Sequence, residues 1–226
     1  MSVKKEKKET KHKWQAQVQQ IFGIPVWVTE PYSFSDKEKR FIKKIYIDGD
    51  LTSNKGDNKT SKNSYLLDEK ELKDIRYFVL ENLDAFWHGF LKADPSIKLK
   101  LTQSWANYNE KNTHHHSHSH PNSIVSGVMY LQNTAPIIFE RSYHNNFWPQ
   151  FHFNHTGSTI FNSSDITVNT ENRVLLLFPS TTFHRVSPNT SENCRISISL
   201  NTFPMGTLGE KEKLTQLKLD ELKDRT

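Results

Sequence analysis

The histidines of this chain are spaced in a way that could hold a metal ion. His118 and His120 lie two residues apart, His184 follows much later, and Arg195 comes eleven residues after it. Imidazole is the commonest metal ligand, and residues i and i+2 of an extended backbone point the same way. His118 and His120 could therefore form a two-ligand clamp. With His184 as third ligand the site would keep open positions, which is typical of catalysis.

The same histidines allow a simpler interpretation. His114, His115 and His116 directly precede the clamp, and a histidine-rich loop that binds metal loosely, or is only solvated, would have the same composition. A lone histidine after a strand is also more often structural than a ligand. His116 and His114 are alternative ligands to His120. Without His120 the ion would have two protein ligands and an additional water.

A second signal is the alternating strand that begins at Arg195. One face carries Arg195, Ser197, Ser199 and Asn201, and the other carries Ile196, Ile198 and Leu200. In an ordinary sandwich the polar face would meet solvent. If it lines a cavity instead, the guanidinium can bind a carboxylate bidentately and the Ser197 hydroxyl can donate a further bond. The pattern then predicts a receptor for an anionic co-substrate.

The elements that must position these residues change in character along the chain. Residues 21–28 predict an edge strand that contains Pro25, and Ser35 predicts a capped helix start. An amphipathic helix follows and ends before Pro95. Helices first and strands afterwards predict a mainly β fold: a double-stranded β-helix, or jelly roll, buttressed by N-terminal α-helices.

After Pro95 the apolar period falls to two residues. Residues 97–107 read as a half-buried strand with Asn107 on the inward parity, and the apolar runs 124–131 and 174–178 are typical of sandwich strands. We therefore expect the following division of the chain: 1–16 a disordered basic tail; 17–205 a single jelly-roll domain, with the helical buttress at about 35–93 and the β core at about 97–203; 206–226 a charged C-terminal tail or helix.

Composition limits the compartment and the partners. The net charge of the 226 residues is +5, and much of this excess lies in the N-terminal lysines, so we expect no nucleic-acid partner. Cys194 is the single cysteine and fits a reducing compartment. No apolar run approaches membrane-spanning length. We expect a soluble cytoplasmic protein without a membrane partner, and the sequence leaves a homodimer open.

Several motifs recur in a fixed order along residues 20–203. They are Trp105-x-Asn107, His118-x-His120-Pro, Ser126-Gly127-Val-Met-Tyr130-Leu131, Phe178-Pro179-Ser180, His184 and Arg195-Ile-Ser-Ile-Ser-x-Asn201. Together they resemble the Fe(II)- and 2-oxoglutarate-dependent dioxygenases, and more narrowly the branch called "putative 2OG-Fe(II) oxygenase". The superfamily usually has His-x-Asp or His-x-Glu at the first motif. His120 departs from that pattern, but it is similar to the narrower branch, whose own first motif is His-x-His-Pro.

The resemblance implies Fe(II), the co-substrate 2-oxoglutarate and O2, and a hydroxylation that releases succinate and CO2. It implies these roles: metal ligands His118, His120 and His184; 2-oxoglutarate binding by Arg195 with Ser197 and Tyr130; contact of Asn107 with 2-oxoglutarate or substrate. The plainer interpretations are a packed core ring for Tyr130 and a strand-end hydrogen bonder for Asn107. No catalytic residue is expected beyond the metal site.

The substrate and two rival functions stay open. The long connection 141–162 contains Trp148, Phe151 and His152, which we expect to face the substrate unless they pack as a hairpin on the sandwich. Their mixture suits a peptide, a sugar or a nucleobase. One rival is a cupin-like three-histidine iron dioxygenase that needs no 2-oxoglutarate. The other is a non-catalytic metal-binding jelly-roll module.

Overall fold

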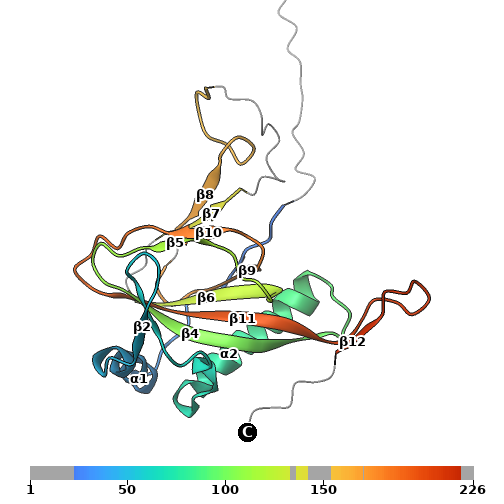
Figure 1. Cartoon of the computed structure of the whole chain (residues 1–226), viewed down its shortest axis with the longest axis horizontal. Coiled ribbons are helices and arrows are strands. Elements are labelled where there is room, and N and C mark those ends of the chain that lie inside the picture. Colours follow the sequence, from blue (N-terminus) through green and yellow to red (C-terminus); the bar gives the residue numbers. More distant parts are fainter. Residues whose placement is uncertain (1–22, 133–135, 142–153, 170, 220–226) are drawn as a thin grey trace, which may run out of the picture.

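The computed structural model describes residues 23–132, 136–141, 154–169 and 171–219, and these form two facing antiparallel sheets (Figure 1). The larger sheet has the order β1-β9-β6-β11-β4-β3-β2, with β12 paired to β11, and the smaller has the order β5-β10-β7-β8. The strands of the larger sheet are β1 (Trp27–Val28), β2 (Leu51–Ser53), β3 (Lys59–Ser61), β4 (Lys98–Asn109), β6 (Val125–Gln132), β9 (Leu175–Pro179), β11 (Arg195–Leu208) and β12 (Leu217–Leu219). Those of the smaller are β5 (His115–His118), β7 (Ile137–Glu140), β8 (Asp165–Val168) and β10 (His184–Val186). The mainly β fold class predicted from the sequence is confirmed.

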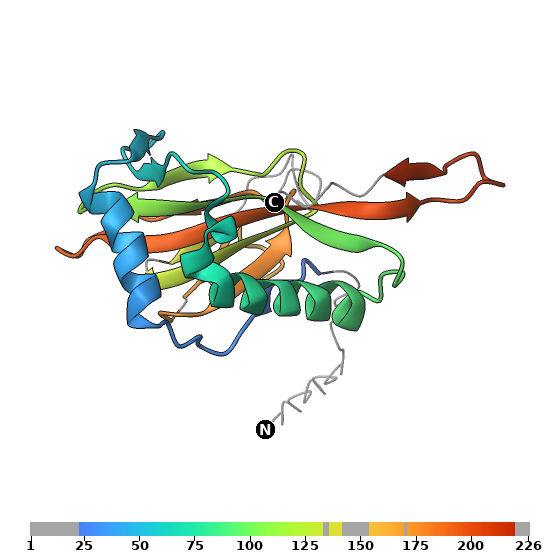
Figure 2. The ribbon, with the colours of Figure 1, turned by 90° about the horizontal axis from the view of Figure 1, so that it is seen from below.

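Helices cover the outer face of the larger sheet (Figure 2). The helix α1 (Asp36–Ile47) begins at a capping box: the Ser35 hydroxyl accepts from the Glu38 amide, and the Glu38 carboxylate accepts from the Ser35 amide at 2.6 Å. The helix α2 (Lys73–Asp84) continues as the π-helical segment η3 (Ala85–Phe90), after the short 3-10 turns η1 (Leu66–Asp68) and η2 (Lys70–Leu72). None of the helices in the described ranges is long and apolar enough to span a membrane.

The larger sheet is buried on both faces, which explains why its central strands are apolar runs rather than alternating ones. In β9, Leu175 and Leu177 pack under the helices, whereas Leu176 and Phe178 pack between the two sheets. The strand β11 differs, because only Ile196, Ile198 and Leu200 join the core under the helices. Its other face is polar and buried, and it looks toward the smaller sheet.

A β-bulge changes the face of β4. Asn201 pairs with Gln103, but the next residue of β11, Thr202, pairs with Leu101, so Thr102 is an extra residue. The predicted alternation therefore switches sides at Thr102. Leu101 packs under the helices, whereas Asn107, which has the same parity, lines the cavity between the sheets. The expectation that residues 97–107 keep one parity on one face was wrong at this point.

The C-terminal segment differs from the expected tail or helix. The strand β11 runs on to Leu208, beyond the expected domain end, and β12 returns antiparallel to it as a projecting hairpin (Figure 1). Gly209 begins the turn at a φ of +69°, a backbone conformation that glycine adopts at little cost. The basic tail predicted for residues 1–16 lies outside the described residues.

Gly127 is expected to be intolerant of a side chain. A Cβ at this position of β6 would lie 2.7 Å from Cδ2 of Leu177 and 2.9 Å from the carbonyl oxygen of Leu176. Because the neighbouring strand cannot yield easily, Gly127→Ala should lower the free energy of unfolding by about 1–3 kcal/mol in urea titration. Gly89→Ala is the matched control, because a Cβ there meets no atom within 4 Å. Equal stability of the two variants would contradict the tight approach of β9.

Candidate metal and co-substrate site

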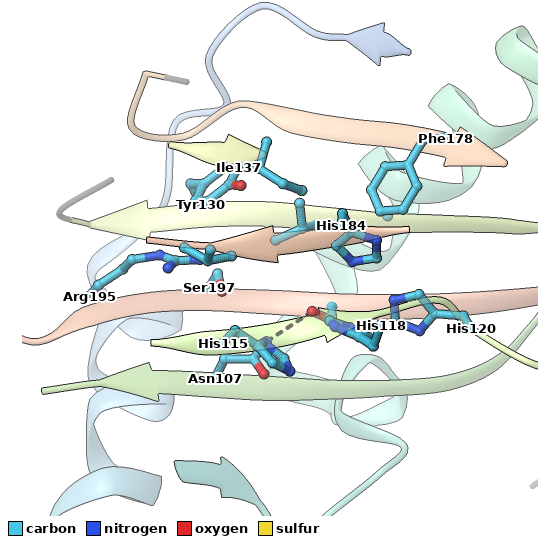
Figure 3. A pocket seen from close by; sticks show the side chains of 14 residues that line it. Asn107, His115, His118, His120, Tyr130, Ile137, Phe178, His184, Arg195 and Ser197 are labelled. Carbon is cyan, nitrogen blue, oxygen red and sulfur yellow. Dashed lines mark hydrogen bonds between the residues drawn. The ribbon is translucent and has the colours of Figure 1, made fainter. Parts of the chain in front are cut away.

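Three histidines from two segments meet at one end of the cavity between the sheets (Figure 3). His118 ends β5 and pairs directly with His184, the first residue of β10, while His120 follows two residues after β5. The ring centroids of His118 and His184 are 4.4 Å apart, and that of His120 lies 5.0 Å and 5.2 Å from them. One nitrogen from each ring lies within 4.8 Å of the others. This geometry can hold one metal ion.

Backbone carbonyls fix the tautomers of two of these rings. Nδ1 of His118 donates to the carbonyl oxygen of His116 at 2.8 Å, and Nδ1 of His184 donates to that of Thr182 at 2.9 Å. A carbonyl oxygen can only accept, so each Nδ1 carries the proton and each Nε2 has a lone pair to offer. Such hydrogen bonds are the usual way in which a metal-ligating histidine is oriented.

His120 is positioned through its backbone and a buried hydroxyl cluster. Its amide donates to the carbonyl oxygen of Ser180 at 2.9 Å. The Ser180 hydroxyl in turn lies 2.7 Å from the hydroxyls of both Ser126 and Ser123. This hydroxyl cluster connects the end of β9 with the start of β6. These bonds tie the loop after β5 to the larger sheet. These hydrogen bonds therefore position His120 through its backbone and do not involve its ring nitrogens.

Burial keeps the three imidazoles neutral. The pKa of His120 is lowered to about 3 and that of His184 to about 4; burial is the largest cause of both shifts, and neighbouring imidazoles contribute to them. Burial also lowers the pKa of His118. A neutral imidazole is the form that binds a metal. In the part of the chain that the structure describes, no residue that lines this cavity is an aspartate or a glutamate.

We expect the metal-free protein to lose stability as the pH falls from about 7 to about 5. The unfolded chain binds protons on these imidazoles below its usual pKa near 6.5, but folded His184 does so only near its pKa of about 4. The contribution of these imidazoles to the free energy of unfolding is therefore fully present above about pH 6.5, and it is lost as the pH falls toward the pKa of the folded state. At about pH 5, His184 alone accounts for about 2 kcal/mol.

Urea unfolding of the metal-free protein at about pH 7.5 and about pH 5 measures this loss. A His184→Gln variant should lose less stability between the two conditions than the parent. A His114→Ala variant, which removes an exposed ring, should lose as much as the parent. A parent with equal stability at both pH values would argue against buried neutral imidazoles.

Arg195 lies at the other end of the cavity, away from the histidines (Figure 3). Its side chain is 2% exposed, and Nε and Nη1 have no hydrogen-bond partner among the described residues. The guanidinium lies 5.6 Å from the ring centroid of Tyr130, and burial lowers its pKa. An arginine stays charged in proteins, and a buried charge is costly unless it is paired. The site therefore calls for an anion at this end.

The strand register places the other predicted co-substrate residues in one row. Ser197 of β11 pairs with Asn107 of β4 on one side and with Tyr130 of β6 on the other. All three line the cavity and are almost fully buried. In the Asn107 side chain, Nδ2 donates to the Ser199 hydroxyl at 2.9 Å and Oδ1 accepts from the Trp105 indole at 3.1 Å. Tyr130 belongs both to this wall and to the core between the sheets.

His115 is the main cavity residue that the sequence did not single out. A bulge in β5 explains this, because His184 pairs with His118 whereas Val186 pairs with His115. The additional residue brings His115 to the same side as His118, and the two rings stack at 4.4 Å. Within the described residues the metal-holding group contains neither His114 nor His116. Trp148, Phe151 and His152 lie outside the described residues.

A family model and several solved structures resemble this chain. Residues 103–201, which run from β4 to β11, match a family model described as "Putative 2OG-Fe(II) oxygenase". That stretch contains all of the predicted site residues: Asn107, His118, His120, Tyr130, Trp148, Phe151, His152, His184, Arg195 and Ser197. No curated protein matches the chain in sequence.

Solved structures of the same fold are distant in sequence. A Trichoplax adhaerens prolyl hydroxylase in complex with a peptide fragment is 14% identical, with 79% of this chain and 83% of that chain covered and a TM-score of 0.54. A Pseudomonas putida prolyl-4-hydroxylase is 11% identical, with coverages of 78% and 91% and a TM-score of 0.53. The epimerase SnoN with Fe3+, alpha ketoglutarate and nogalamycin RO is 9% identical, with coverages of 79% and 78% and a TM-score of 0.55.

At these identities the likeness concerns the fold. The cofactors predicted from the sequence, Fe(II) and 2-oxoglutarate, are those that the description of the matched family names. Residues 103–201 thus match the family described as "Putative 2OG-Fe(II) oxygenase", and the chain shares the fold of solved structures that include 2OG-Fe(II) oxygenases.

Proposed function

We propose that this chain hydroxylates its substrate with O2 and 2-oxoglutarate, and releases succinate and CO2. His118, His120 and His184 would hold the ferrous ion, and Arg195 would bind the far carboxylate of 2-oxoglutarate. The observation that carries the proposal is a buried guanidinium whose Nε and Nη1 have no hydrogen-bond partner among the described residues, in the same cavity as three neutral imidazoles.

The charges of the cavity fit both groups. Imidazole is a suitable ligand for iron, and three neutral rings leave the charge of a divalent ion uncompensated. Because none of the described residues that line this cavity is an aspartate or a glutamate, a bound anion would balance both the metal and Arg195. A dicarboxylate offers one carboxylate to each end. This favours 2-oxoglutarate over the cupin-like alternative, which would leave Arg195 unpaired.

Each part of the chain has a separate task in this reaction. When bound, iron supplies the oxidation of the substrate by O2 coupled to decarboxylation of 2-oxoglutarate. Arg195 and Ser197 would orient the co-substrate, and the carbonyl contacts of His118 and His184 keep each Nε2 unprotonated and able to bind the metal. The apolar side chain of Phe178, packed against His184 with ring centroids 4.8 Å apart, excludes water from that side. Hydroxylation needs no further acid or base, and we assign none.

Oxygen uptake by iron-loaded protein tests the proposal. We expect slow uptake even without substrate, dependent on added 2-oxoglutarate and matched by succinate in equal amount. A product heavier by one oxygen atom identifies the hydroxylation once a substrate is found. Oxygen uptake that is the same without 2-oxoglutarate would favour the three-histidine dioxygenase. Absence of tightly held iron after dialysis would favour the non-catalytic module.

A further inference from the structure

His115 lines the cavity beside the metal-holding histidines and has no task in the reaction described above. Its ring stacks on that of His118, with centroids 4.4 Å apart and an interplanar angle of 19°. Along the cavity, His115 lies between Arg195 and His118 (Figure 3). A ligand that reaches from the guanidinium to the metal site therefore passes this ring.

The tautomer of His115 is fixed by Asn54. Oδ1 of Asn54 accepts from the Lys55 amide at 2.8 Å, and Nδ2 of Asn54 lies 3.2 Å from Nε2 of His115. An amide nitrogen can only donate, so Nε2 of His115 accepts and the proton of the neutral ring is on Nδ1. Because Nε2 is occupied and Nδ1 is protonated, His115 is a hydrogen-bond donor rather than a further metal ligand.

The hairpin of β2 and β3 holds Asn54 in this place. The Asn54 backbone amide donates to the Asn58 carbonyl at 2.9 Å, and the His114 amide donates to the Gly56 carbonyl at 3.1 Å. A Cβ at Gly56 would lie only 2.7 Å from the His114 carbonyl oxygen, which shows how closely the turn approaches β5. Since the turn is bonded to the residue before His115, the hairpin and this ring keep their relative position.

The two nitrogens of His115 point to different sides of the ring. Asn54 lines a second hollow, outside the histidines, and is not among the described residues that line the inner cavity. Nδ1 is directed away from Asn54. It has no hydrogen-bond partner among the described residues, and it is not one of their fully buried unpaired atoms. Because the ring lines the inner cavity, this N–H is available to a ligand there.

The proposed co-substrate offers only acceptors to this donor. The other amide side chain on this wall, Asn107, already donates to Ser199 and accepts from Trp105. With the far carboxylate on Arg195, the oxo group and the near carboxylate belong at the metal end, where His115 stacks on His118. A hydrogen bond from an N–H to a carboxylate is charge-assisted and about twice as strong as a neutral one.

We propose that His115 is a further co-substrate-binding residue, whose Nδ1–H donates to the near carboxylate of 2-oxoglutarate. This inference rests on the proposed function and adds a residue to the same site. The alternative is a structural role, in which the ring only supports His118 by stacking. The first role needs the N–H, and the second needs the flat ring.

Two substitutions separate the N–H from the ring. His115→Phe keeps a flat ring beside His118 and removes the donor, whereas His115→Asn removes the ring and keeps an N–H near the position of Nδ1. In anaerobic titration of the iron-loaded protein, 2-oxoglutarate should bind about tenfold more weakly to His115→Phe and within about threefold of the parent to His115→Asn. A structural role predicts the opposite order. Both variants should keep their iron, because His115 is outside the metal-holding group.

His116→Phe is the matched control. It makes the same change one residue later, at a ring that lines the second hollow and is not among the residues that line the inner cavity. It should bind 2-oxoglutarate as the parent does. Thermal unfolding checks that all variants are folded. Nitrogen-15 NMR of the parent with Zn(II) needs no substitution, and it should show the Nδ1–H of His115 shifting when 2-oxoglutarate is added.

2-Oxobutyrate identifies the end of the co-substrate that His115 binds, because it has the 2-oxo acid group and lacks the far carboxylate. His115→Phe should weaken binding of 2-oxobutyrate by the same factor as binding of 2-oxoglutarate. Arg195→Met should weaken binding of 2-oxoglutarate alone. An effect of His115→Phe that is seen with 2-oxoglutarate and absent with 2-oxobutyrate would contradict the near carboxylate as the acceptor.

The inference is overturned if His115→Phe binds 2-oxoglutarate as tightly as the parent, or more tightly than His115→Asn does. An Nδ1–H signal of His115 that stays unchanged on addition of 2-oxoglutarate would also overturn it. In each of these cases the parent still binds the co-substrate, so the proposed function stands. A parent that does not bind 2-oxoglutarate would refute the proposed function, and this inference with it.

Discussion

Replacing Arg195 by methionine is expected to weaken binding of 2-oxoglutarate by about 2–5 kcal/mol while iron stays bound. The guanidinium is buried, and two of its nitrogens have no partner among the described residues, so its charge is available to the ligand. Methionine fills a similar volume without the charge. Anaerobic titration of the iron-loaded protein with 2-oxoglutarate measures the loss through the metal-to-ligand charge-transfer absorption.

The metal-free protein provides a second measurement on the same variant. A buried cation without a partner is destabilising, so Arg195→Met should unfold at no lower temperature than the parent. Arg185→Met is the matched control, because Arg185 of β10 forms half-exposed ion pairs with Glu140 and Asp165. It should bind 2-oxoglutarate as the parent does. Unchanged 2-oxoglutarate affinity in Arg195→Met would refute the assigned anchor.

The second large effect is expected at His184. Changing a residue that only supports a metal ligand costs about 10–100-fold in affinity, so loss of the ligand in His184→Ala should cost at least about 100-fold. His184 pairs with His118 across the strands, and within the described ranges the metal-holding group consists of His118, His120 and His184. Iron content after anaerobic dialysis should fall from about one ion per chain to nearly none.

Two further histidine variants separate the alternatives for the first motif. His114→Ala should keep its iron, because the ring is exposed and lies outside the metal-holding group. His120→Ala should lose iron if His120 is a ligand, and should keep it if water takes that position. Several weakly bound ions that disappear in His114→Ala, but not in His184→Ala, would instead support loose binding by the histidine-rich segment.

Local patterns were sufficient for the residues that lie on one regular strand. The alternation from Arg195 to Asn201 predicted a polar face, and that face lines a cavity because the smaller sheet covers it. The Ser35 cap and the core strands near 125–131 and 175–179 were likewise local signals, since capping and apolar runs depend on neighbours in sequence.

Features set by pairing between distant strands could not be predicted in this way. The bulge at Thr102 reverses the faces of β4, and the bulge in β5 turns His115 toward His118. Each bulge depends on the register with a partner strand that is distant in sequence. A local apolar period does not encode that register. The C-terminal hairpin is similar: a charged tail or helix was expected for residues 206–226, whereas the continuation of β11 provides a strand for β12 to pair with.

A crystal structure with Fe(II) and 2-oxoglutarate, grown without oxygen, tests the central claim most directly. The account predicts one iron bound by Nε2 of His118, His120 and His184, with the far carboxylate of 2-oxoglutarate on Arg195. Iron bound among His114, His115 and His116 would contradict it, as would a 2-oxoglutarate molecule that makes no contact with Arg195.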